Sequence, residues 1–111
     1  MKVLIIVPTY NERENLPALA ARILDEFSYE VLVVDDRSPD GTGAVADDLA
    51  RRYPGRLHVM HRTGERGLGL PYLDGFRWAL RTGADLICQM DADLSHDPRY
   101  LPDLVAAAAD H

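Results

Sequence analysis

Carboxylates are the residues of this 111-residue chain whose spacing points most directly to chemistry. Six of them directly follow or interrupt the ends of apolar stretches: Glu12, Asp35, Asp36, Asp40, Asp91 and Asp93. Clustered acids repel each other unless a cation or hydrogen-bond donors lie nearby. A hard divalent cation prefers oxygen ligands and can bridge to a diphosphate. The pair Asp91 and Asp93 therefore predicts a metal site that can also hold a phosphate-containing ligand.

Each of these motifs also has a plainer structural interpretation. An Asp-x-Asp after a strand is often a cap or a turn, and Asp35-Asp36 can be turn residues in the same way. Asp97-Pro98 is typical of an ordinary helix start. His58 and His61 fall on the predicted third strand and are expected to pack in the core or on the surface. His96 lies in the acidic loop, where both a structural and a functional role stay open.

The elements that must position the acids alternate along the chain. Apolar, β-branched stretches predict buried parallel strands at residues 2–8, 30–36, 56–62 and 84–90. Segments with helical periodicity follow at residues 11–27, 38–53 and 69–83, and again from Pro98. Asn11 and Glu14 have the spacing of a capping box, and Ser38-Pro39 has the pattern of an N-cap followed by the first helical residue. This alternation predicts an α/β fold with a doubly wound parallel sheet.

That architecture gives the acids a common location. Ligands of open parallel sheets bind at the carboxyl ends of the strands, where the connecting loops converge. The loops here are residues 8–12, 35–41, 62–69 and 91–98, and all of them are polar. We therefore expect the six acids to share one rim of the sheet.

Composition limits the classes of protein and partner. The chain is 47% hydrophobic with a net charge of −6, which fits one ordinary domain and disfavours binding to nucleic acid or to a bare anionic membrane through charge. The single cysteine, Cys88, excludes an intrachain disulfide and fits a reducing compartment. No apolar run is long enough to span a membrane. The chain ends inside an apolar helix, which predicts the front part of a longer protein with an exposed sheet edge that could pair two copies in a homodimer.

Four motifs in order carry a resemblance to a known family. They are "VPTYNERENL" (7–16), "VVDDRSPDGT" (33–42), "RGLGLPYLDGF" (66–76) and "MDADLSHDP" (90–98). Together they resemble the family 2 glycosyltransferases of GT-A type, over residues 4 to about 104. "DADLSH-x-P" favours the branch of dolichol- and polyprenol-phosphate mannosyltransferases, and related polyprenol-phosphate glucosyltransferases share much of the pattern.

The resemblance implies a three-layer α/β/α, Rossmann-like fold in which residues 1–111 form the nucleotide-sugar-binding half of the domain, truncated at its C-terminal end. It implies that the base, ribose and remaining nucleotide contacts come from Pro8, Tyr10, Glu12, Val34 and Asp36. It also implies that Mg²⁺ or Mn²⁺ and the donor diphosphate are held by the catalytic residues Asp91 and Asp93, with the backbone of Ala92 on the nucleotide and Ser95 at a further metal-ligand position.

The implied reaction transfers mannose from GDP-mannose to a dolichyl or polyprenyl phosphate with inversion. The lipid phosphate is already ionised near neutral pH, so no general base is assigned. The resemblance also implies a cytoplasmic protein that is peripheral at the cytoplasmic face of a membrane. Three departures from the family pattern are Arg37, Glu65 and the pair Leu70-Pro71.

Two alternatives within reach of the same residues stay open. One is a polyprenol-phosphate glucosyltransferase that uses UDP-glucose, and the other is a nucleotide- or metal-binding fragment without activity of its own. A phosphoacceptor receiver domain fits less well, because its acid pair should follow the first strand, where "VPTYNE" lies instead.

Overall fold

The computed structural model describes residues 1–63, 70–92 and 98–109 of the chain. Within these residues, parallel strands form one sheet in the order β3-β2-β1-β4. The strands are β1 (Val3–Thr9), β2 (Glu30–Asp35), β3 (Leu57–His61) and β4 (Leu86–Gln89). The helices are α1 (Leu16–Glu26), α2 (Thr42–Arg52), α3 (Leu70–Arg81) and α4 (Leu101–Ala109), the last preceded by a 3₁₀ turn at Pro98–Tyr100. The predicted α/β class with a doubly wound parallel sheet is confirmed.

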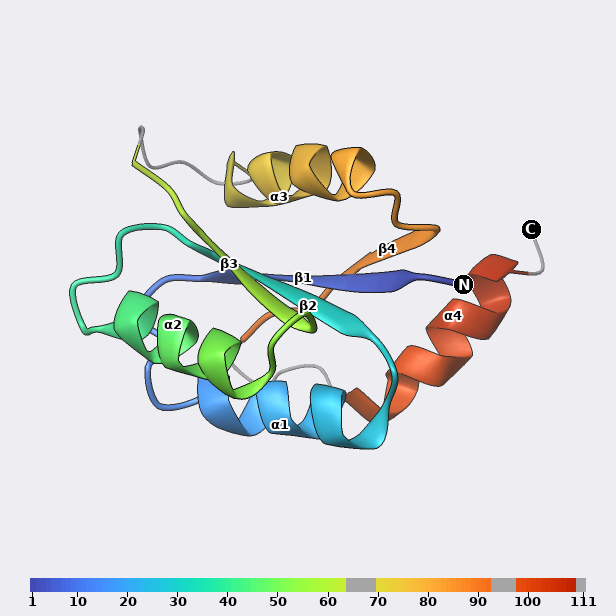
Figure 1. The fold of residues 1–111 in the computed structure, drawn as a ribbon, viewed down its shortest axis with the longest axis horizontal. Coiled ribbons are helices and arrows are strands. Elements are labelled where there is room, and N and C mark those ends of the chain that lie inside the picture. The colour runs from blue at the N-terminus through green and yellow to red at the C-terminus, as the bar shows by residue number, and fades with distance from the viewer. Residues whose placement is uncertain (64–69, 93–97, 110–111) are drawn as a thin grey trace.

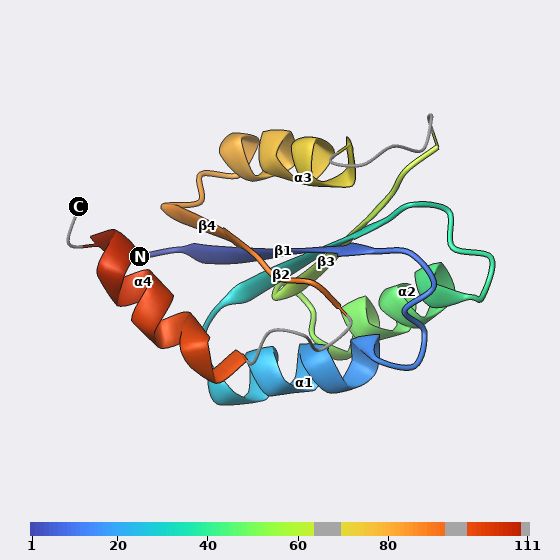
Figure 2. The same cartoon turned by 180° about the vertical axis from the view of Figure 1, so that it is seen from behind.

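Helices cover both faces of the sheet and make three layers. Figures 1 and 2 show α3 alone on one face, and α1, α2 and the start of α4 on the other. The alternation of side chains along β1 supplies both cores: Ile5 faces α1, whereas Leu4 and Ile6 face α3. β1 and β2 are the central strands, so both of their faces are buried, which explains why their sequences are continuous apolar runs.

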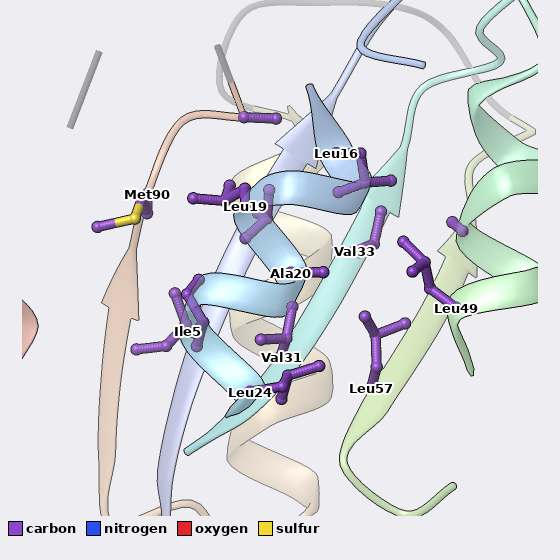
Figure 3. Close-up of a cluster of buried hydrophobic side chains, with 14 of the residues drawn as sticks. Ile5, Leu16, Leu19, Ala20, Leu24, Val31, Val33, Leu49, Leu57 and Met90 are labelled. Carbon is purple, nitrogen blue, oxygen red and sulfur yellow. The ribbon is translucent and has the colours of Figure 1, made fainter. Parts of the chain in front are cut away.

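The larger core lies between the sheet and α1. Figure 3 shows the side chains of α1 meeting those of β1, β2 and β3, with Met90 at the end of β4 closing one side. The labelled members are Ile5, Leu16, Leu19, Ala20, Leu24, Val31, Val33, Leu49, Leu57 and Met90. On the opposite face α3 approaches closely at Gly75, where an added Cβ would lie 3.0 Å from the Cγ2 atoms of Ile6 and Val34. The two faces are therefore packed tightly enough to fix the strand ends.

The start of α1 differs from the prediction. The capping box at Asn11 and Glu14 is wrong, because the helix begins at Leu16 with Asn15 as its N-cap. Asn11 has a φ of 57°, a left-handed conformation that a helical N-terminus does not use. The backbone amides of residues 11–13 bond to the loop after β2 instead, so a long-range contact replaces the local cap.

The start of α2 also differs. The prediction of Ser38 as N-cap is wrong, because α2 begins at Thr42 after Gly41, whose φ is 94°. The Ser38 hydroxyl donates to Asp35, and Asp40 accepts the amide of Thr42 in its place. The ends of the later elements agree better with the sequence: α3 ends at Arg81, two residues before Gly83, and a helical turn begins at Pro98.

Arg56 joins the two loops at the opposite end of the sheet. Its guanidinium donates to the carbonyl oxygens of Leu24, Phe27 and Tyr29 at 2.8, 2.7 and 2.7 Å. The bonds to Leu24 and Phe27 satisfy carbonyls that the end of α1 leaves without intrahelical partners, and the bond to Tyr29 holds the residue before β2. Among the residues described, no helix is both long and apolar enough to cross a membrane.

Candidate functional site

The carboxyl ends of the strands meet at one rim, as the parallel topology requires. The amide of Asp36 donates to the carbonyl of Thr9 at 3.0 Å, and the amide of Met90 donates to that of Ile6 at 3.0 Å. Pro8 on β1 lies in register with Val34 on β2, one residue before the rim. The residues that follow β1, β2 and β4 are therefore neighbours in space although they are about 25 to 80 positions apart in sequence.

Asp35 is a structural carboxylate rather than an open ligand. It is only 3% exposed, and its two oxygens accept hydrogen bonds from the protein itself. The Thr9 hydroxyl donates to Oδ1 at 2.8 Å, the Ser38 hydroxyl donates to Oδ1 at 2.6 Å, and the Ser38 amide donates to Oδ2 at 3.1 Å. Hydrogen bonds to an ionised acceptor are among the stronger ones in proteins, so Asp35 ties β1 to the loop after β2.

Side chains after β2 hold the backbone of the loop after β1. The Asn11 amide donates to the Ser38 hydroxyl at 2.9 Å, and the Glu12 amide donates to the Thr42 hydroxyl at 3.0 Å. The Arg13 amide donates to Oδ2 of Asp40 at 3.2 Å. The two loops are thus joined by hydrogen bonds in which neutral hydroxyls and the carboxylates of Asp35 and Asp40 both take part.

Asp40 is engaged in the same loop. Its Oδ1 accepts from both the amide and the hydroxyl of Thr42. The Thr42 hydroxyl bond is the main reason that the pKa of Asp40 lies below its usual value, with smaller contributions from the amides of Thr42 and Arg13. Asp40 is therefore ionised and committed to the turn before α2.

Asp36 points to a different partner. Its Oδ1 accepts from Nη1 of Arg62 at 2.7 Å, and both side chains are nearly buried, at 11% and 7% exposed. Nε of Arg62 donates at 2.7 Å to Oδ2 of Asp74 on α3. Arg62 therefore lies between two carboxylates that come from different layers of the fold.

The remaining residues implied for nucleotide binding differ in exposure. Tyr10 is 44% exposed at the rim, and Glu12 is partly buried and accepts from the side-chain amide of Asn15 at 3.1 Å. Pro8 is partly buried, whereas the Val34 side chain is fully buried in the core beneath α3. Val34 is 0% exposed as a whole residue, so neither its side chain nor its backbone offers accessible surface to a ligand in this structure.

The implied metal site is described only in part. Asp91 is exposed directly after β4, and Ala92 beside it is 2% exposed and packs in the core. Asp93 and Ser95 lie outside the described residues, as do His96 and Glu65. Over residues 1–63, 70–92 and 98–109, no three metal-ligating side chains gather into a cluster. Asp91 supplies one accessible oxygen ligand of the type that Mg²⁺ and Mn²⁺ take.

Several residues acquire roles that spacing did not reveal. Thr9, Ser38, Thr42, Arg62 and Asp74 shape the rim through bonds between loops. The only local signal was the Ser/Thr-rich turn chemistry of residues 38–42.

Two of the features noted in the sequence have structural explanations. His58 and His61 lie on opposite faces of β3: the His58 ring lies 5.1 Å from that of Trp78 on α3, and His61 contacts α2. Their Nε2 atoms are each 2.9 Å from a carboxylate oxygen, of Glu30 and Asp47 respectively. Arg37 has a φ of 56°, a conformation in which small and amide residues are less strained. Its departure from the family pattern therefore carries a backbone cost.

Nearly the whole chain is similar to known glycosyltransferases. The family model described as glycosyl transferase family 2 matches residues 4–111. A polyprenol monophosphomannose synthase of Mycolicibacterium smegmatis is 54% identical over 98% of this chain and 43% of its own length. An undecaprenyl-phosphate mannosyltransferase of Micrococcus luteus is 53% identical over 96% of this chain and 44% of its own. The chain thus spans less than half the length of these curated relatives.

A solved structure gives a further comparison. The mannosyltransferase of Pyrobaculum calidifontis, determined in complex with GDP-Man and Mn²⁺, superposes with a TM-score of 0.79 at 29% identity. The superposition covers 94% of this chain and 31% of that one. The shared part is therefore the sheet and the rim described above.

Proposed function

Because the chain belongs to glycosyl transferase family 2, we propose that it forms the nucleotide-sugar-binding part of a polyprenyl-phosphate mannosyltransferase. Its α/β fold is of the GT-A type, as the sequence predicts. The observation that carries the proposal is the high identity, over nearly the whole chain, to two enzymes named for transfer of mannose to a lipid phosphate. The proposed donor is GDP-mannose, and the proposed acceptor is a polyprenyl or dolichyl phosphate.

The nucleotide would lie across the carboxyl ends of β1 and β2. Tyr10 offers an exposed aromatic ring there, and Asp36 offers a nearly buried carboxylate that can accept a hydrogen bond from a base. Pro8, Glu12 and the backbone of Ala92 would complete the base and ribose contacts. The hydrogen bonds that join the two loops support this proposal, because they organise the surface before a ligand arrives.

The donor diphosphate would lie toward Asp91 and Asp93. These two carboxylates, with the Ser95 hydroxyl, are an all-oxygen donor set of the kind that fits Mg²⁺ or Mn²⁺. A metal bound there supplies Lewis-acid stabilisation of the charge on the departing diphosphate.

The transfer itself needs little proton chemistry from this chain. An ionised oxygen of the lipid phosphate forms the new bond to the anomeric carbon, and the bond from that carbon to GDP breaks with its electron pair leaving on GDP. Attack from the face opposite GDP inverts the anomeric carbon. The chain's task is to bind and orient the donor so that this line of attack stays open.

Other parts of the interpretation stay predictions. The acceptor site and a location at the cytoplasmic face of a membrane concern the whole protein. The homodimer predicted from the sheet edge would involve β3 or β4, which are the outer strands of the described sheet.

Calorimetric titration of GDP into the chain tests the proposal. We expect binding with Mn²⁺, loss of binding with EDTA, and weaker binding of UDP. Asp91→Asn and Asp93→Asn should each abolish the metal-dependent part while leaving the circular dichroism spectrum unchanged. The matched control is Asp48→Asn, which alters an exposed carboxylate on α2 that pairs with Arg51.

The outcomes separate the alternatives. Preference for UDP would favour the polyprenol-phosphate glucosyltransferase and contradict GDP-mannose as donor. Binding of GDP that persists unchanged in EDTA and in both aspartate variants would refute the metal-dependent site. A folded chain that binds neither nucleotide would refute the proposal for these residues.

A further inference from the structure

The outer side of α3 is one continuous stripe of exposed residues. Figures 1 and 2 show α3 alone on its face of the sheet, with no other described helix over it. Gly75 and Ala79 are buried against the sheet, so the residues on the opposite side of the helix point away from the protein. Four exposed residues with the spacing i, i+4, i+7 and i+8 form this side, here called the α3 stripe: Leu73, Arg77, Leu80 and Arg81.

The leucines of the α3 stripe expose a large apolar area. Leu73 is 48% exposed and Leu80 is 61% exposed, and they are two of the four large hydrophobic residues exposed in the described part of the chain. They lie about 10 Å apart along the helix, because each residue adds about 1.5 Å. Two leucines on the same side of one helix form a patch, whereas a single exposed apolar residue is ordinary.

The arginines of the α3 stripe are not neutralised by carboxylates. Within residues 1–63, 70–92 and 98–109, neither Arg77 nor Arg81 has an ion pair or a side-chain hydrogen bond. Asp74, the one acid of α3, is directed to Nε of Arg62 at the rim. Among the described helices, α3 alone has more basic than acidic residues. A chain with a net charge of −6 therefore carries a local surface that is cationic and apolar.

This combination restricts what can cover the α3 stripe. A second copy of the same stripe would place arginines against arginines, with no acid on either side to offset the repulsion. A bilayer with anionic headgroups meets both requirements at once, because leucines can enter the boundary of the acyl chains while arginines stay at the phosphates. Such a surface also attracts each basic residue that lies close to it.

We propose that the α3 stripe docks this chain on the surface of a bilayer that contains anionic lipids. The inference goes beyond the nucleotide site and does not depend on it. It has a consequence for the rim, because Asp74 in the first turns of α3 accepts from Arg62 at 2.7 Å. Docking through the stripe would thus hold the carboxyl ends of the strands beside the lipid headgroups.

Co-sedimentation of the chain with vesicles tests the proposal. We compare vesicles of phosphatidylcholine alone with vesicles that contain about 30% phosphatidylglycerol, and expect partition of the original chain to be more than about tenfold stronger on the anionic ones. Each arginine near such a surface contributes about fivefold, so Arg77→Gln/Arg81→Gln should lose about 25-fold. The matched control, Arg51→Gln/Arg52→Gln, makes the same change of charge at exposed positions of α2, on the other face of the sheet, and should stay within about twofold of the original.

The leucines are tested separately from the charge. Leu73→Gln/Leu80→Gln keeps both arginines and should lose more than about tenfold on the anionic vesicles, because the buried apolar area is removed. All four positions are exposed, so each variant should unfold in urea within about 0.5 kcal/mol of the original chain, which excludes misfolding as the cause of a loss.

The outcomes decide for or against the α3 stripe. An original chain that partitions to neither kind of vesicle, or to both equally, would overturn the inference. So would an Arg77→Gln/Arg81→Gln protein that binds like the α2 control, or a leucine variant that binds like the original. Light scattering gives a further check: self-association of the original chain that Leu73→Gln/Leu80→Gln abolishes would assign the stripe to a second copy and not to a bilayer. None of these results bears on GDP binding, so the proposed function is tested independently.

Discussion

The substitution Asp35→Asn distinguishes two explanations of the acidic rim by the sign of its effect. If the six acids mainly repel each other until a cation binds, then removing one charge should stabilise the metal-free chain. The structure predicts the opposite, because Asp35 is 3% exposed and accepts three hydrogen bonds from Thr9 and Ser38. We therefore expect Asp35→Asn to lower the free energy of unfolding in EDTA.

The magnitude follows from what asparagine can replace. Its oxygen can still accept from the two hydroxyls, but its NH₂ group would meet the Ser38 amide, so one bond is lost and two donors face each other. A hydrogen bond to a charged acceptor contributes about 1.5–3 kcal/mol, and weakening the other two adds to the loss, so we expect a total of about 2–3 kcal/mol. For a chain of this size that corresponds to a fall in Tm of roughly 8–12 °C.

The assay is urea unfolding in EDTA, followed by the fluorescence of Trp78, the only tryptophan. Asp91→Asn is the control, because Asp91 is exposed at the same rim and its substitution should change stability by less than about 0.5 kcal/mol. An Asp35→Asn protein as stable as the original chain, or more stable, would refute the assignment of Asp35 as a structural carboxylate.

Three further predictions concern other residues. The Thr42 hydroxyl lowers the pKa of Asp40 from its usual 3.8, so ionised Asp40 stabilises the fold above about pH 4, and this stabilisation is lost as the pH falls through the lower folded-state pKa. Urea unfolding at pH 7 and pH 3 should therefore show a smaller acid-induced loss of unfolding free energy in Asp40→Asn than in the original chain. An unchanged loss would contradict this. Arg56→Met removes three hydrogen bonds to carbonyl oxygens and should lower the free energy of unfolding in urea by about 3 kcal/mol. The control, Arg51→Met at an exposed position, should lower it by less than about 0.5 kcal/mol, and similar losses for both would refute the capping role. Burial raises the pKa of the Cys88 thiol, so iodoacetamide at pH 8.5 should modify the folded chain more slowly than the urea-unfolded chain, and equal rates would count against it.

The sequence predicted the sheet well because its strands are central and buried. β1 and β2 are apolar on both faces, and such continuous runs are read without knowledge of their partners. The end of α3 was predicted from Gly83, whose φ of 77° is a local requirement that glycine meets. Where the determinant is local, the sequence alone was sufficient.

The starts of α1 and α2 were predicted wrongly because their determinants are distant. The spacing of Asn11 and Glu14 satisfies a local capping rule, but the amide of Asn11 bonds to Ser38, 27 positions away. Ser38 in turn is drawn to Asp35 and does not cap α2. Single-sequence rules compare a cap only with its own helix, so they miss a partner that the fold brings in from another loop.

Hydrogen bonds from distant residues also change the interpretation of the acidic rim. Within the described residues, hydrogen bonds from the protein already reach Asp35, Asp36, Asp40 and Glu12, whereas Asp91 is exposed at the end of β4. Of the two means expected to offset the clustered acids, a cation or hydrogen-bond donors, the donors therefore serve most of the rim. The charge left for a metal belongs to Asp91 and, by the resemblance, Asp93, so the metal is expected to act on the ligand rather than on the fold. Since hydrogen bonds within the protein already join the loops after β1 and β2, the nucleotide half of the rim is organised independently of the metal half.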